Sequence, residues 1–219
     1  MKKLISVLLC LALVFSFAAC GKGEEANTPD TSKPAVEDTE AATKVKISRG
    51  VILDDVYTNA FAGFKFTKPA EWVYLSDEEI AQTINAGQDT MDLNAIEQAL
   101  ANTASVYDMA AQDQYGNSVM VCYENTMITA LREVSVDEYE QQLKSQLSSV
   151  ENIEYEFISS DDVTLGGKTY RKIDTVATTQ GVTLSQAYYL MVSGKYVVSV
   201  ICTSTNFDIS AMEALFSAV

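Results

Sequence analysis

The second half of the chain alternates between apolar runs and short turns that contain glycine. Four runs are rich in Val, Ile, Tyr and Thr: 153–164, 168–178, 182–192 and 196–205. A short turn lies directly before each of the last three runs. These turns are Gly166-Gly167, Gln180-Gly181 and Ser193-Gly194. Glycine turns between β-branched runs of this length are typical of hairpins. The pattern therefore predicts an antiparallel meander of four strands. The last strand is apolar at almost every position, which predicts that both of its faces are covered.

The middle of the chain predicts a further hairpin and an amphipathic helix. Runs 104–112 and 118–126 flank the turn Tyr115-Gly116-Asn117. Between this hairpin and the meander, apolar residues recur at the i, i+3, i+7, i+11 and i+14 positions of 136–150 and mark one helical face. Ser135 and Glu138 have the spacing of a capping box, which places the helix start.

Three shorter helices are predicted elsewhere. Ser76 and Glu79 repeat the capping spacing, and Gly87 suits the end of that helix. A second helix is expected over 92–100 with Leu93, Ile96 and Leu100 inward. A third is expected over 208–218, where an apolar stripe is formed by Met212, Leu215, Phe216 and Val219. Together these elements predict the α+β class: an antiparallel sheet with helices packed on both faces, as an α/β/α sandwich.

The first twenty residues have the three-part layout of a secretory signal. Lys2 and Lys3 precede an apolar run, and Ala18-Ala19 stands directly before Cys20. Phe17-Ala18-Ala19-Cys20 resembles the end of a bacterial lipoprotein signal, although Leu is commoner than Phe17 at its position. The resemblance implies that residues 1–19 are removed, that Cys20 is acylated, and that the protein is held at the extracytoplasmic face of the cell membrane. The alternative is an uncleaved transmembrane anchor, but the apolar run is shorter than the roughly 20 residues that span a bilayer.

Composition divides the rest of the chain into a tether and one domain. Residues 20–48 follow the signal and are rich in Glu, Thr, Ala, Lys and Pro, with no aromatic residue. Such a segment cannot bury enough apolar surface to offset its ordering entropy, so we expect a flexible tether. Residues 49–219 have the length of a single globular domain. They hold 9 Lys and Arg against 24 Asp and Glu, which argues against nucleic acid and against lying flat on anionic lipid.

Short motifs at the start of the domain resemble the PsbP-like superfamily, which includes DcrB-like lipoproteins. They are Tyr57-x-Asn59, then Gly63-Phe64-x-Phe66, then Pro69-x-x-Trp72, followed by a capped helix. The glycine hairpin, Gln186–Leu190 and the last strand extend the likeness over most of 50–219. The resemblance implies an antiparallel α/β/α sandwich that docks onto a larger assembly and carries no shared chemistry.

The sequence marks no catalytic or cofactor site. The chain has no histidine, which excludes Ser-His-Asp and Cys-His nucleophiles and histidine-bound metals. Gly166-Gly167-Lys168-Thr169 lacks the first glycine and the following helix of a phosphate-binding loop, so a hairpin turn is expected. Residues 89–94 are the nearest approach to a calcium loop, without its ligand spacing. We therefore predict no catalytic residue, no metal and no cofactor.

The remaining polar and reactive residues have structural explanations. Asp77-Glu78-Glu79 and Asp137-Glu138 fit helix starts, where the helix dipole favours acidic side chains. Asp161-Asp162 is expected at a strand end or in a loop. Trp72 is expected in the core, with a surface ligand anchor as the alternative. Cys122 and Cys202 are expected as two buried thiols, although the compartment would permit a disulfide.

These features predict a lipid-anchored, non-catalytic module that binds another envelope protein. A lipoprotein that binds a small molecule or metal ion is the alternative. A hydrolase with paired carboxylates is disfavoured because no local pattern marks the pair.

Overall fold

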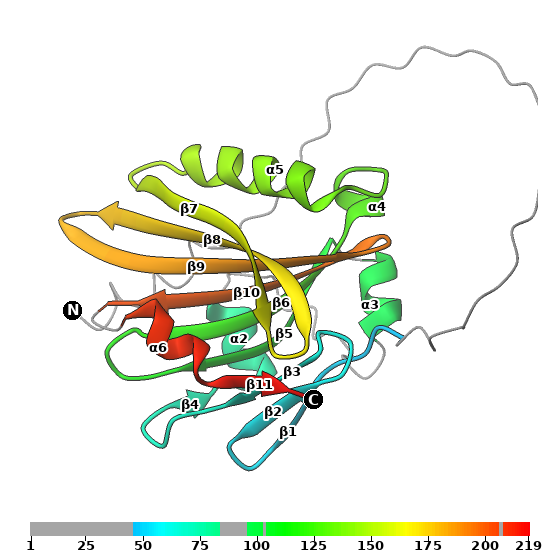
Figure 1. Cartoon of the computed structure of the whole chain (residues 1–219), viewed down its shortest axis with the longest axis horizontal. Helices are drawn as coiled ribbons and strands as arrows, with labels where there is room; N and C mark the ends of the chain where they lie inside the picture. The colour runs from blue at the N-terminus through cyan, green and yellow to red at the C-terminus, as the bar shows by residue number, and fades with distance from the viewer. Residues whose placement is uncertain (1–45, 84–95, 103, 206–207) are drawn as a thin grey trace, which may run out of the picture.

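A seven-stranded antiparallel sheet forms the centre of the protein (Figure 1). The computed structural model describes residues 46–83, 96–102, 104–205 and 208–219. In spatial order the strands are β4 (Val73–Tyr74), β5 (Ser105–Gln112), β6 (Ser118–Asn125), β10 (Tyr196–Ser204), β9 (Val182–Ser193), β8 (Lys168–Thr179) and β7 (Glu154–Leu165). The predicted meander and hairpin are both confirmed. They join through β6 and β10, with Val121 opposite Val200.

A second, four-stranded sheet was not predicted. Its strands, in spatial order, are β1 (Val51–Leu53), β2 (Val56–Asn59), β3 (Phe64–Thr67) and β11 (Phe216–Ala218). Side chains alternate along β2 and β3, so that Tyr57, Phe64 and Phe66 are fully buried against the large sheet. These aromatic side chains belong to one of the two hydrophobic cores.

The prediction of a helix over 208–218 is wrong in its second half. The helix α6 (Ile209–Glu213) is short, and the chain continues as β11. Phe216 lies opposite Phe66, and the two ring centroids are 5.2 Å apart. The amide of Thr67 donates to the carbonyl of Leu215 at 2.9 Å. Pairing with β3 therefore provides hydrogen-bond partners for backbone groups at the edge of the sheet. It also packs the Phe216 ring against Phe66, where a continued helix would not place it.

Helices pack on both faces of the large sheet, as predicted. On one face lie α2 (Asp77–Thr83) and α5 (Val136–Ser148), which contribute Ile80, Tyr139, Leu143 and Leu147 to one core. On the other face lie α6, the four-stranded sheet and α3 (Ile96–Asn102), with Ile96 and Leu100 buried. Strand β10 contributes side chains to both cores, which confirms that it is covered on both faces.

The helix starts follow the predicted capping chemistry. Ser135 and Glu138 form a complete capping box at α5. At α2 the amide of Ser76 donates to Glu79, and the amide of Glu79 donates to the Ser76 hydroxyl. A one-turn helix, α4 (Thr126–Thr129), was not predicted. Gly87, Leu93 and the calcium-like stretch 89–94 lie outside the described residues. Within the described part of the chain, no helix combines the length and apolar character needed to cross a membrane.

Candidate functional site

A buried carboxylate, Asp108, lies between the two sheets at an irregularity in β5. The pairing of β5 with β6 shifts register between Tyr107 and Met109, so Asp108 is an extra residue in the strand. Tyr107 belongs to one core and Met109 to the other. The bulge thereby turns the Asp108 side chain toward the four-stranded sheet, where none of it is exposed to solvent.

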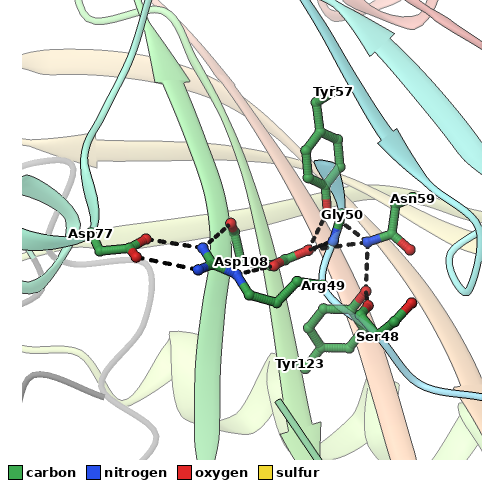
Figure 2. Close-up of polar contacts among 8 residues, drawn as sticks. All are labelled: Ser48, Arg49, Gly50, Tyr57, Asn59, Asp77, Asp108 and Tyr123. Carbon is green, nitrogen blue, oxygen red and sulfur yellow. Dashed lines mark hydrogen bonds and ion pairs between the residues drawn. The ribbon is translucent and has the colours of Figure 1, made fainter. Parts of the chain in front are cut away.

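Both oxygens of Asp108 accept hydrogen bonds from the beginning of the domain (Figure 2). Arg49 Nε donates to Oδ1 at 2.9 Å. The backbone amide of Gly50 and the hydroxyl of Tyr57 donate to Oδ2 at 2.8 and 2.5 Å. Asn59 Nδ2 lies 3.1 Å from the same oxygen. The carboxylate is therefore saturated with donors from β2 and from the segment before β1.

Asn59 fixes the direction of these hydrogen bonds. Its Oδ1 accepts from the amide of Ala62 at 2.8 Å, so its Nδ2 must face the hydroxyls of Tyr57 and Tyr123, at 2.6 and 2.5 Å. Tyr123 in turn donates to the carbonyl of Ser48 at 3.2 Å. Asn59 Nδ2 is therefore the donor to both tyrosine hydroxyls, and each hydroxyl is left to donate its own proton, from Tyr57 to Asp108 and from Tyr123 to Ser48.

Arg49 connects this cluster to helix α2. Its Nη1 and Nη2 donate to the two carboxylate oxygens of Asp77 at 3.2 and 2.9 Å, in the paired geometry that suits a guanidinium. Nη2 also donates to the Asp108 carbonyl at 3.1 Å. We call Arg49, Tyr57, Asn59, Asp108 and Tyr123 the Asp108 cluster.

Burial dominates the electrostatics of the cluster. It raises the pKa of Asp108, and hydrogen bonds from Tyr57, Gly50 and Arg49 oppose that rise. Burial also raises the pKa of Tyr57 and of Tyr123 well above the ordinary value, and the Asp108 charge adds to both shifts. A general base must reach a substrate proton directly or through one water. Because Asp108 is fully enclosed and its oxygens are occupied, the geometry favours a structural role for the cluster.

The sequence did not single out Asp108 or Arg49. The available signal was one acidic residue inside the apolar stretch Val106–Ala111, which would require a buried partner. Tyr57 and Asn59 did appear in the family-like motif. The structure explains this spacing, because alternate residues of β2 point to the same buried carboxylate.

Most residues singled out in the sequence lie where they were predicted. The acidic pairs do begin α2 and α5. Gly166-Gly167 forms the turn between β7 and β8, as predicted. Trp72 is buried, with its ring centroid 6.3 Å from that of Phe66. Placement of Asp161-Asp162 at a strand end or in a loop is wrong. Both lie inside β7, where Asp162 faces Arg171 of β8 and accepts from its Nε at 2.7 Å.

The two buried cysteines are free thiols, as predicted. They lie on adjacent strands, but Cys122 is opposite Ser199 and Cys202 is opposite Val119. Their side chains also belong to different cores, on opposite faces of the large sheet. A disulfide would need the two sulfurs on the same face, so this geometry excludes a bridge between them.

A partly buried ion-pair cluster surrounds Arg171 on the α5 face. Arg171 Nη1 donates to Asp137 at 2.9 Å and to Glu140 at 2.6 Å, while Lys144 Nζ contacts Glu140 at 2.6 Å. Burial by itself would raise the pKa of Glu140, but the hydrogen bonds from Lys144 and Arg171 lower it to about 2. Within the described residues, no three His, Cys, Asp or Glu side chains gather as a metal site would require.

The Glu140 pairing predicts a loss of stability in acid. A carboxyl with a lowered folded-state pKa stabilises the protein above its unfolded pKa of about 4.3, and this contribution disappears as the pH falls toward 2. With solvent screening, we expect about 1 kcal/mol. Urea unfolding of wild type and Glu140→Gln between pH 6 and about 2.5 measures it. Convergence of the two curves in acid is expected. A constant difference at every pH would contradict the prediction.

The fold defines an α+β domain built on antiparallel sheets. No protein-family model and no curated protein matches the chain. Among solved structures, the chain is similar to the solution structure of cyanobacterial PsbP (CyanoP) from Synechocystis sp. PCC 6803. The two sequences are 10% identical, the match covers 82% of this chain and 98% of that chain, and the TM-score is 0.44. The chain is also similar to a crystal structure from Bacteroides thetaiotaomicron VPI-5482. The two sequences are 12% identical, the match covers 78% of this chain and 48% of that chain, and the TM-score is 0.38. At these scores, neither similarity supports a functional inference.

Proposed function

We propose that this protein is a lipid-anchored, extracytoplasmic module without catalytic activity, which binds another protein of the cell envelope. The observation that carries the proposal is the position of the Asp108 cluster. It holds Arg49 and Gly50 at the start of the domain. The domain begins slightly earlier than predicted, because the predicted tether includes Ile47 and Ser48, but Ile47 is buried in the core and the Ser48 carbonyl accepts from Tyr123.

This arrangement suits a domain that is held through its N-terminal segment. Tension on the segment would pass from Arg49 to β5 through Asp108, and to helix α2 through Asp77. A flexible tether raises the effective concentration of the domain at the membrane and leaves it free to reach a neighbour. Acylation of Cys20 with more than one chain would make the attachment stable.

Binding to a protein partner rests on two further points. The motifs around Tyr57, Phe66 and Trp72 resemble those of PsbP-like domains, which dock onto larger assemblies. The Asp108 carboxylate is closed to solvent and saturated with donors, which favours a mechanical role for the Asp108 cluster over a chemical one.

The anchor is tested by replacing the predicted acylated residue. We expect Cys20→Ala to accumulate as a precursor that retains residues 1–19, and to incorporate no labelled fatty acid. Cys10→Ala is the matched control, because Cys10 lies inside the apolar run of the signal, and it should mature normally. Mass spectrometry of the purified protein measures both. A mature product of normal mass from Cys20→Ala would contradict lipidation.

The partner is tested by cross-linking the full-length protein in its native membrane. We expect one protein to be recovered with wild type and lost with Cys20→Ala, because the unprocessed form does not occupy the same place. Recovery of no specific protein would contradict the partner and favour a small-molecule or metal-ion ligand. A ligand of that kind would be recognised by a raised melting temperature.

A further inference from the structure

We infer that the end of the domain that carries α4 inserts three apolar side chains into the surface of the lipid bilayer. The inference rests on the proposed lipid anchor but does not depend on the protein partner. The three side chains are those of Met127, Ile128 and Leu131, which are 46%, 38% and 71% exposed. We call them the α4 knob.

The α4 knob stands on a rigid base. Asn125 caps α4 by accepting from the amide of Met127 at 3.1 Å, and its Nδ2 donates to the Leu100 carbonyl at 2.7 Å. The amide and hydroxyl of Thr126 both donate to the Lys195 carbonyl, at 2.9 and 3.1 Å. These contacts fix α4 to α3 and to the turn between β9 and β10. The exposed apolar side chains are therefore held in place before any binding event, which reduces the entropy lost on insertion.

Backbone conformation adds a second unusual feature to the same place. Leu131 follows the α4 C-cap with φ of 58°, in the left-handed region that normally holds glycine or asparagine. A large apolar side chain in this conformation is both strained and exposed to water. Removal of Leu131 from water would offset the strain that its backbone carries.

The described chain begins at the end of the domain where the α4 knob lies. The Ser48 carbonyl accepts from Tyr123, and Tyr123 is two residues before the residue that caps α4. Figure 1 shows the first described residues on the same side of the molecule as α3 and α4. A lipid anchor attached through the predicted tether would therefore draw this end of the domain, rather than the opposite end, toward the bilayer.

Two basic side chains lie near the α4 knob, within a domain that is acidic overall. Arg132 follows the α4 knob in the chain and is ion-paired with Glu138 at 2.9 Å, and Lys195 lies exposed in the adjacent turn. Apolar side chains flanked by cations are typical of segments that enter a membrane interface, because the cations can stay at the level of the headgroups. The domain as a whole is strongly acidic, so anionic headgroups would repel a broad face of it more than a small apolar end. The expected orientation is end-on, with the acidic body away from the membrane.

Fluorescence quenching in protein-free vesicles tests the inference. Full-length, acylated protein carries a polarity-sensitive dye at Leu131→Cys, and is reconstituted in phosphatidylcholine vesicles that carry a quencher on the acyl chains. The native thiols Cys122 and Cys202 are buried and should not be labelled. The matched control is Val182→Cys, which is 48% exposed at the opposite end of β9, roughly 36 Å from the α4 end.

We expect a blue shift and a several-fold larger loss of emission at position 131 than at position 182. A second dye position, Met127→Cys, should behave like position 131, and the added substitution Leu131→Asp should abolish its quenching. Equal quenching at 131 and 182, or no quenching at 131, would overturn the inference. Shielding of position 131 only in native membranes would also overturn it, because a protein would then cover the α4 knob.

These outcomes are separate from failure of the proposed function. If the full-length protein does not sediment with the vesicles, the lipid anchor itself is wrong. If the dye at position 131 is quenched but native membranes yield no cross-linked protein, the bilayer contact stands and the protein partner is wrong.

Discussion

Replacement of Asp108 by alanine is expected to lower the free energy of unfolding by about 3–5 kcal/mol. The substitution removes the acceptor for Arg49, Gly50 and Tyr57 at once and leaves their donors inside the protein. It also detaches the first residues of the domain from β5. Urea unfolding followed by circular dichroism at neutral pH measures the loss.

Asp77→Ala is the matched control for this prediction. Asp77 binds the same guanidinium as Asp108, but its side chain is 49% exposed, so solvent replaces much of the interaction. We expect a loss of about 0–1 kcal/mol. Similar losses for Asp77→Ala and Asp108→Ala would contradict the view that the buried contacts of Asp108 fasten the N-terminal segment.

Gly166→Ala is expected to be the second large change, with a loss of about 2–4 kcal/mol. Gly166 has φ of 61°, and a Cβ at this position would lie 2.5 Å from Phe64 Cβ and 2.8 Å from the Gly63 carbonyl oxygen. Neither atom is the end of a flexible side chain. The turn between β7 and β8 would have to move away from β3, which would break the hydrogen bond from the Gly167 amide to the Gly63 carbonyl.

Gly181→Ala separates backbone strain from steric contact. Gly181 has φ of 80°, but a Cβ there meets no atom within 4 Å. Its loss should reflect the left-handed backbone alone, at about 1 kcal/mol. Thermal unfolding of the two variants side by side measures the difference. Equal melting temperatures would show that the contact between Gly166 and β3 contributes little to stability.

Sequence patterns predicted the large sheet well because its information is local. Strands β7 to β10 are joined by short turns, so each strand pairs with its neighbour in the chain. Glycines at those turns, with β-branched runs between them, are enough to predict the hairpins. The capping residues Ser76 and Ser135 located two helix starts for the same reason, since the capping contact spans three positions.

The four-stranded sheet could not be predicted because its pairing is distant in the chain. The stripe formed by Met212, Leu215 and Phe216 fits a helix by its spacing. The alternative, an edge of β3 that accepts Phe216, lies far away in the sequence and leaves no local trace. Pairing with β3 in the folded protein is what makes the segment around Phe216 a strand and not a helix.

The candidate site was only partly visible in the sequence. Tyr57 and Asn59 belonged to a recognisable motif, but the residue that explains them is Asp108, on a different sheet. A bulge in β5 turns Asp108 toward them, and neither strand periodicity nor composition marks that bulge. The ion pair between Arg171 and Asp162 could not be found from local spacing, because it joins two strands. The pair of Glu140 and Lys144 has the i, i+4 spacing of a helical ion pair, so the sequence did carry a signal for it.

The pairing of β11 with β3 has a consequence for the order of assembly. Phe216 and its partner Phe66 are separated by about 150 positions, so this contact has high contact order and closes a very long loop. Because the chain is synthesised from its N-terminus, β3 emerges long before β11 and has one edge unpaired until β11 follows. Such an edge, flanked by buried aromatic positions, is a site for aggregation. Protection from aggregation is therefore most needed during that interval, and variants at Phe216 should reduce the yield of folded protein more than they reduce the stability of the finished fold.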